Sequence, residues 1–292
     1  MNPDSLQALL DSRLTTPVRV HWFTEIDSTN AEALRRLRGE DARSGGIDGV
    51  DGADDSAGDT LLLAGAQSAG RGRRGRSWVS EPGSGIFLSL IRSLTLPQTA
   101  LPGLSLVTAL VVRDAVAALG GDKIHVKWPN DVLHKRNKLA GILLESHAVA
   151  TKTSTRPHNA TGKQEPPIGV VFGIGINLAL SPEAEAQINH PVTDLTRVLG
   201  KKPEPEPLIA DLIARHSEAV DQYLAEGFAP FQQAWNKADR YFEEDVVVEQ
   251  NGERLIGRAE GVDDNGALQF ITATGKHLIS GGEIFPSVRP ND

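Results

Sequence analysis

The chain has 292 residues, of which 39% are hydrophobic and 23% are charged, values that fit a globular protein with one large domain or two unequal ones. It contains no cysteine, and its eight histidines lack metal-ligand spacing. Disulfides, thiolate metal sites and a cysteine nucleophile are therefore excluded, and a zinc site is not expected. The formal net charge of −8 argues against general nucleic-acid binding, which needs a broad basic face.

No apolar run is expected to reach the roughly 20 residues that a membrane-spanning helix needs. The N-terminus has neither the basic start nor the long apolar stretch of a secretion signal. We therefore expect a cytoplasmic protein with no membrane partner.

The first part of the chain is predicted to mix helices and strands. Leucines at helical spacing indicate a short helix over residues 6–14, and alternation indicates a strand over 18–23. Ser28, Thr29 and Asn30 are favoured helix N-cap residues and predict a helix over 31–37. The same reasoning predicts, in order, strands at 60–67 and 86–91, a long helix at 104–119, strands at 124–128, 138–145 and 168–177, and helices at 208–224 and 228–238.

Two segments are predicted to be surface loops. Residues 39–59 are rich in Gly and Asp, and residues 151–167 are polar and contain Pro. Neither has enough large apolar residues to bury.

After residue 240 the pattern changes to short strands separated by tight turns. Asn251-Gly252 and Asn265-Gly266 are favoured hairpin turns because both central residues need positive φ. We therefore predict an α+β fold, with a mixed β-sheet domain packed with helices over residues 1–240 and a small β-barrel over 241–292.

The most informative motif is Gly-Arg-Gly-Arg-Arg-Gly-Arg at residues 70–76, between two predicted strands. Glycines let a backbone approach a ligand closely, and guanidinium groups bind phosphate or carboxylate with paired hydrogen bonds. A solvated Arg/Gly loop or an RNA-contacting segment is the alternative, but the pattern stops after seven residues and runs into Trp78 and a strand. It matches neither a GxxxxGK[ST] phosphate loop nor a GxGxxG dinucleotide turn.

Three further motifs are ambiguous taken singly. Residues 127–131 read Lys-Trp-Pro-Asn-Asp, which taken alone favours an ordinary turn over a site in which Asp131 binds Mg²⁺. Lys138 opens an apolar strand, where a lysine is more often a surface residue at the strand end than a ligand contact. Residues 173–177 read Gly-Ile-Gly-Ile-Asn, whose glycine face would admit either a ligand or a helix of the protein itself.

Together the motifs at 28–30, 70–76, 127–131, 138–143 and 173–177 resemble, in content and order, the catalytic domain of the biotin–protein ligases. The resemblance extends into the tail, at Gly281-Gly282-Glu283-Ile284, and implies that the C-terminal barrel is SH3-like. About 25 residues precede Ser28, fewer than the helix-turn-helix repressor domain of bifunctional members needs. We therefore expect a monofunctional ligase without operator binding.

The resemblance also implies roles for individual residues. Biotin would be bound by Ser28, Thr29, Asn30, Gln67, Arg71, Gly72, Arg73 and Lys138, with Arg73 and Lys138 also catalytic. ATP would be bound by Arg76, Trp78, Asn130, Asp131 and Asn177, with Trp78 stacked on adenine and Asp131 on Mg²⁺.

The implied reaction joins biotin to ATP as biotinyl-5'-AMP and then transfers biotin to a lysine of a biotin carboxyl carrier protein. ATP with Mg²⁺ and biotin are substrates, and no tightly bound prosthetic group is expected. A homodimer through strand edges is also compatible with such a sheet. Two alternatives stay open: a lipoate–protein ligase of the same fold, and a non-enzymatic nucleic-acid binder.

Overall fold

A computed structural model describes residues 1–40, 58–148, 167–250 and 252–286. Most of the two predicted loops, at 39–59 and 151–167, lies outside these described residues.

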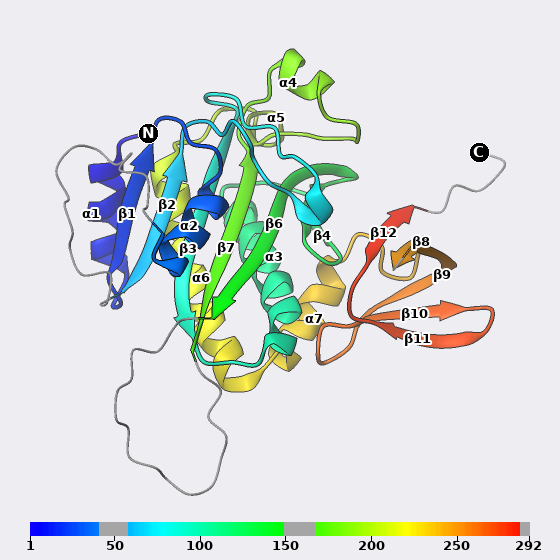
Figure 1. Cartoon of the computed structure of the whole chain (residues 1–292). Coiled ribbons are helices and arrows are strands. Elements are labelled where there is room, and N and C mark those ends of the chain that lie inside the picture. The colour runs from blue at the N-terminus through cyan, green and yellow to red at the C-terminus, as the bar shows by residue number, and fades with distance from the viewer. Residues whose placement is uncertain (41–57, 149–166, 251, 287–292) are drawn as a thin grey trace, which may run out of the picture.

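A seven-stranded mixed sheet forms the larger part of the described chain (Figure 1). Its order is β1-β2-β3-β7-β6-β5-β4; β1 and β2 run parallel, and all other neighbours are antiparallel. The strands are β1 (Val18–Phe23), β2 (Asp59–Ala64), β3 (Gly85–Leu94), β4 (Ile124–Lys127), β5 (Asp131–His134), β6 (Asn137–Ala148) and β7 (Ile168–Asn177). The predicted mixed sheet is confirmed.

Helices cover both faces of this sheet. Helix α2 (Thr29–Arg38) lies on one face, and α3 (Leu101–Ala118) and α6 (Pro205–Glu226) lie on the other (Figure 1). Helix α1 (Pro3–Arg13) contacts both α6 and β1. Strand β2 shows why the sequence dictates this arrangement. Its Leu61 and Leu63 belong to the large core that includes α3 and α6, whereas Leu62 and Ala64 belong to the smaller core beneath α2, as the period of two in a strand requires.

Helix α3 corrects the expectation about apolar runs. The segment Gln98–Ala118 is long and apolar enough to cross a membrane by length and composition alone. However, its most apolar stretch, which has a mean hydropathy of 1.5, is 61% buried inside the protein. Leu104, Val107 and Val111 recur at helical spacing and are buried in the core. The apolarity of this helix is accounted for by its central position in the fold.

Several short elements were not predicted. Strand β5, helices α4 (Pro182–Ala186) and α5 (Leu195–Leu199), and the 3₁₀ turns η1 (Arg73–Gly75) and η2 (Gln98–Ala100) have five residues or fewer, which leaves only a weak periodic pattern. The equally short β4 was predicted. Helix α7 (Ala229–Ala238) was predicted.

A second, antiparallel sheet follows. It consists of β8 (Asp245–Gln250), β9 (Glu253–Val262), β10 (Leu268–Thr272), β11 (Gly275–Ile279) and β12 (Glu283–Pro286), in the order β11-β10-β9-β8-β12. This confirms the predicted all-β C-terminal part, although β12 was not predicted as a strand. The boundary after residue 240 stays a prediction; the change of sheet falls between β7 and β8.

Candidate functional site

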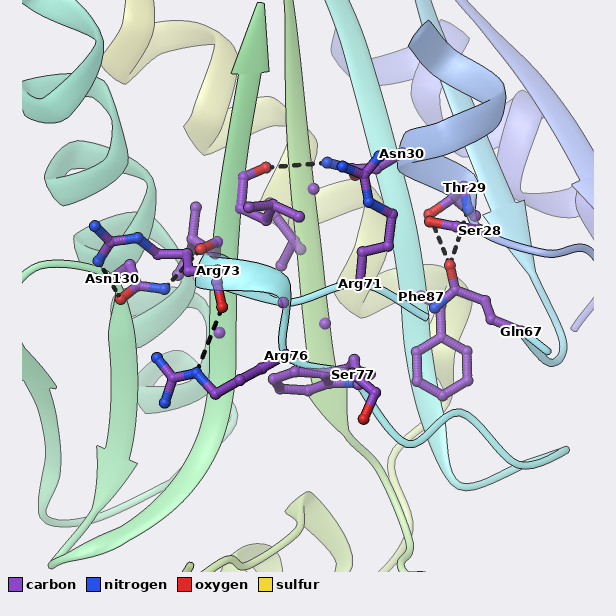
Figure 2. Close-up of a pocket in the computed structure, with 18 of the residues that line it drawn as sticks. Ser28, Thr29, Asn30, Gln67, Arg71, Arg73, Arg76, Ser77, Phe87 and Asn130 are labelled. Carbon is purple, nitrogen blue, oxygen red and sulfur yellow. Dashed lines mark hydrogen bonds between the residues drawn. The ribbon is translucent and has the colours of Figure 1, made fainter. Parts of the chain in front are cut away.

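A hollow lies on the face of the seven-stranded sheet that α2 covers, beside the N-terminus of that helix (Figure 2). Its lining comes from α2, the β2–β3 connection, the β4–β5 turn and strands β3, β6 and β7. It includes twelve of the thirteen residues predicted for the site: Ser28, Thr29, Asn30, Gln67, Arg71, Gly72, Arg73, Arg76, Trp78, Asn130, Asp131 and Lys138. Segments more than 100 residues apart in sequence are thus brought together.

The N-terminus of α2 is held by a hydrogen-bonded network. The Ser28 side chain accepts from the backbone N–H of Ala31 at 3.4 Å, which confirms its predicted N-cap position. Gln67 Oε1 accepts from the backbone N–H of Thr29 at 2.8 Å and from its hydroxyl at 3.2 Å, as Figure 2 shows. Gln67 Nε2 donates to Ser80 at 3.0 Å, so the helix start and the β2–β3 connection are fixed to each other.

The arginine motif forms a short turn over the hollow, with Arg73 to Gly75 as η1. Two of its glycines are structurally required. A Cβ on Gly70 would lie 2.4 Å from the carbonyl oxygen of Trp78, and Gly75 has φ +72°, which favours glycine. The loop therefore folds back on itself and carries the guanidinium groups of Arg71 and Arg73 to the site (Figure 2).

The arginines of this loop differ in their partners. Arg71 pairs with Glu145 at 2.8 Å, and Arg76 pairs with Glu283 of β12 through two hydrogen bonds of 2.8 and 2.9 Å. Within the described residues Arg73 forms no ion pair; it donates to Asn130 Oδ1 at 3.1 Å. Burial, reinforced by the nearby charge of Arg74, lowers the pKa of Arg73. Because a guanidinium stays protonated at neutral pH, Arg73 is a half-buried cation without a counterion.

Lys138, Asp131 and Lys127 form a second charged group at the sheet edge. Lys138 Nζ lies 2.8 Å from Asp131 Oδ1, and Lys127 Nζ lies 3.9 Å from Asp131 Oδ2. Burial alone raises the pKa of Asp131, but the two ammonium groups outweigh it and the net shift is downward. Asp131 is therefore ionised and balanced by two cations.

Trp78 packs against the sheet over two glycines. A Cβ on Gly141 would lie 2.8 Å from the indole ring, and one on Gly175 would lie 2.7 Å from it. Lys138 Nζ sits 5.2 Å from the centroid of the same ring. The glycine face of β7 thus receives side chains of the protein itself: Trp78 at Gly175 and Asn30 at Gly173.

Two predicted nucleotide contacts have structural partners. Asn130 accepts from Arg73 and donates to the carbonyl oxygen of Ile142 at 2.8 Å. Asn177, the thirteenth predicted residue, is buried and donates to the carbonyl oxygens of Thr193 at 2.9 Å and Lys138 at 3.3 Å. It lines a neighbouring hollow together with Trp78 and Lys138. The structure thus shows how both amides are positioned.

No group of three or more His, Asp or Glu side chains suitable for a metal ion occurs in the part of the chain that the structure describes. The Asp131 oxygens already face Lys138 and Lys127. These residues do not fit a resident metal ion.

Sequence reasoning missed several residues at the site: Ser77, Phe87, Ser89, Glu145 and His190. His190 precedes α5 and lines both hollows; burial, followed by the charge of Lys138, lowers its pKa. Glu145 ends the apolar strand that Lys138 opens, but no role was predicted for it, and the other four lie outside the motifs. The contacts between elements that bring these residues to the site are not visible in sequence.

Comparison with known proteins gives two family matches. Residues 52–155 match the biotin/lipoate A/B protein ligase family, and residues 241–285 match the biotin protein ligase C-terminal domain.

Individual relatives agree. The chain is 34% identical over 270 residues to the biotin–[acetyl-CoA-carboxylase] ligase of Paracoccus denitrificans, covering 89% of this chain and 97% of that protein. It is 34% identical over 243 residues to the bifunctional ligase/repressor BirA of Escherichia coli, covering 83% of this chain but only 66% of the length of BirA.

Among solved structures, the biotin protein ligase from Aquifex aeolicus in complex with biotin and ATP is similar. Its TM-score is 0.67 at 25% sequence identity, covering 91% of this chain and 97% of that one.

Proposed function

This chain belongs to the biotin protein ligase family, and from that premise we propose that it activates biotin with ATP and transfers it to a lysine of an acceptor protein. In the first step the biotin carboxylate attacks the α-phosphate of ATP, giving biotinyl-5'-AMP and pyrophosphate. In the second, the acceptor amine attacks this mixed anhydride, forming an amide and releasing AMP.

The observation that carries the proposal is the uncompensated charge of Arg73. A half-buried cation without a counterion is destabilising unless an anion enters beside it. Glu145, Asp131 and Glu283 are each already paired with another cation. The charge of Arg73 and its remaining N–H donors therefore suit the phosphate of an acyl-adenylate, to which a guanidinium can donate two hydrogen bonds.

The other end of the hollow suits the cyclic urea of biotin. Ser28, Thr29 and Asn30 line it, and their neighbours leave part of their hydrogen-bonding capacity free. A ureido group offers N–H donors and a carbonyl acceptor, whereas the dithiolane ring of lipoate offers no comparable groups. The buried polar groups of this end would be left unpaired by lipoate, which favours biotin.

We assign the remaining roles on the same basis. Gln67, Arg71, Gly72 and Arg73 would contact biotin and its adenylate, and Lys138 would neutralise the carboxylate and the charge that develops on the anhydride. Arg76, Trp78, Asn130, Asp131 and Asn177 would form the ATP side. Asn130 would act there largely by holding Arg73.

Transfer needs no covalent intermediate on the enzyme, in agreement with the absence of cysteine. The name of the Paracoccus relative points to acetyl-CoA carboxylase, so a biotin carboxyl carrier domain is the proposed acceptor. Mg²⁺ would enter as part of the ATP complex. A cytoplasmic location, a homodimer and the absence of nucleic-acid binding belong to the same proposal.

An exchange assay tests the function directly. The purified chain should exchange labelled pyrophosphate into ATP when biotin is added, and lipoate should not replace biotin. A carrier domain added to the reaction should become biotinylated on one lysine. Exchange that does not depend on biotin would refute the proposal, and exchange supported by lipoate alone would favour a lipoate ligase.

A further inference from the structure

Glu145, in the middle of β6, contacts two predicted biotin-binding residues from different parts of the chain. Its Oε2 accepts from Asn30 Nδ2 at 3.0 Å, and its Oε1 accepts from Arg71 Nη2 at 2.8 Å. We propose that Glu145 is a positioning residue for biotin recognition, which fixes the amide of Asn30 in one orientation and restrains Arg71. The proposal rests on the proposed function of the site.

The surroundings of Asn30 allow only one orientation of its amide. The Glu145 carboxylate and the carbonyl oxygen of Leu143, 3.3 Å away, can only accept hydrogen bonds. The NH₂ group must therefore face them and uses both of its protons. On the other side, the Ser89 hydroxyl donates to Asn30 Oδ1 at 2.6 Å. Ser89 is fully buried, so no water competes for this contact. Its single proton can also reach Thr29 Oγ1 at 2.8 Å, and the shorter distance favours Asn30.

This arrangement determines what Asn30 can offer a ligand. With both donors used and one bond already accepted, only the second lone pair of Oδ1 is free. Asn30 can then accept from a ligand N–H but cannot donate to a carbonyl. Gly173 makes room for this amide, because a Cβ there would lie 2.1 Å from Asn30 Oδ1. The site therefore selects a ligand with an N–H donor at this point.

The contact with Arg71 is the weaker part of the arrangement. The Arg71 side chain is 44% exposed, and exposed ion pairs contribute little. Asn30 is 4% exposed, so its hydrogen bonds are shielded from solvent. We therefore expect the orientation of Asn30, rather than the ion pair, to account for most of the effect of Glu145.

Biotin binding without ATP tests this, measured by titration calorimetry on the whole chain. Glu145→Leu removes both contacts and should weaken biotin binding about 10- to 100-fold, the range for loss of a hydrogen bond to a charged group. Glu145→Gln keeps an acceptor for Asn30 and should stay within about threefold of the wild type. Ser89→Ala frees the other side of the amide and should weaken binding by about tenfold or less.

Steady-state kinetics separate positioning from general damage. Glu145→Leu should raise the KM for biotin and leave the KM for ATP unchanged, whereas a disturbed fold would alter both. Exposed Glu253, on β9, provides the matched control, since Glu253→Gln should change neither constant.

The outcomes are distinct. Wild-type protein that does not bind biotin would overturn the proposed function together with this inference. Wild-type protein that binds biotin, with Glu145→Leu and Ser89→Ala binding it equally well, would overturn the inference alone. If Glu145→Leu does not fold, Ser89→Ala and Glu145→Gln decide the matter, and a loss of about tenfold or more in Glu145→Gln, or wild-type binding in Ser89→Ala, would contradict the assigned role of Asn30.

Discussion

Lys138 stands between a carboxylate and an aromatic ring, 2.8 Å from Asp131 and 5.2 Å from the centroid of Trp78. Its ammonium helps to hold the pKa of Asp131 below the usual range, against the upward effect of burial. In the proposed reaction it faces the biotin carboxylate and then the anhydride. Removing it leaves Asp131 with the more distant Lys127 and takes away a cation where negative charge develops.

We therefore expect Lys138→Ala to lower biotin-dependent ATP–pyrophosphate exchange by about 100-fold or more, with the thermal unfolding transition retained. The exposed Lys201 supplies the control, and Lys201→Ala should exchange at the wild-type rate. Full exchange in Lys138→Ala would show that this ammonium does not act on the reacting groups.

Arg73 is the second residue whose removal is informative, because it is half-buried and forms no ion pair within the described residues. Arg73→Gly should release biotinyl-adenylate about tenfold faster or more, since a charge-assisted contact to the intermediate is lost. The rate is measured by trapping adenylate that leaves the enzyme. Asn130→Ala should give a smaller increase, because it removes only the hydrogen bond that orients Arg73. An unchanged release rate in Arg73→Gly would refute the role.

At the scale of elements, β7 divides the site between its two glycines. Gly173 admits the Asn30 amide, and Gly175 admits the indole ring of Trp78. Because alternate residues of a strand share one face, both glycines face the hollow. They contact different parts of its lining, Gly173 the Asn30 amide and Gly175 the Trp78 ring. A methyl group at each position should thus damage different functions.

Gly173→Ala is expected to raise the Kd for biotin, and Gly175→Ala the Kd for ATP, each by about tenfold, which corresponds to the low end of the cost of overpacking. Both constants are measured for both variants by calorimetry, with biotin and ATP titrated separately. Equal losses for both ligands in both variants would contradict this division of the strand.

The strands and long helices were predictable because their side chains bury with a regular period. The predicted bounds of β1 and β7 agree with the structure, and β6 and β3 only extend further than expected. Strand β5 was missed because it has only four residues and begins at Asp131, the last residue of a Pro-Asn-Asp turn motif. The loop and turn motifs of the site were recognisable as motifs. Ser89 and Glu145 were not, because each sits in an ordinary strand and acquires its role from Asn30 on another element.

At the scale of the whole molecule, the two sheets meet beside the site. Arg76 of the arginine loop binds Glu283 of β12, and Trp128 Nε1 donates to the carbonyl oxygen of Gly266 at 3.3 Å. Asp239 lies between α7 and β8 and forms an isolated bridge to Val126 of β4. This junction links the arginine loop over the hollow to the C-terminal sheet.

Asp239 carries an unfavourable charge in that junction. One carboxylate oxygen accepts from the backbone N–H of Tyr241 at 3.0 Å, and the other is buried without a hydrogen-bond partner among the described residues. Burial raises the pKa of Asp239 to about 7. A group whose pKa is higher in the folded state binds its proton more tightly there, so its favourable contribution is complete below about pH 4 and is lost as the pH rises through about 7.

Asp239→Asn removes this titration while keeping an oxygen for Tyr241. The free energy of unfolding of the wild type, measured relative to Asp239→Asn by urea denaturation, should therefore fall by roughly 4 kcal/mol between pH 4 and pH 8.5. The comparison with Asp239→Asn is required because two other groups also change the stability over this pH range. Burial raises the pKa of Asp59 to about 6 and lowers that of His216 to about 3. Parallel pH profiles for the two proteins would show that the carboxylate of Asp239 is solvated, and that the junction between the sheets is open to water.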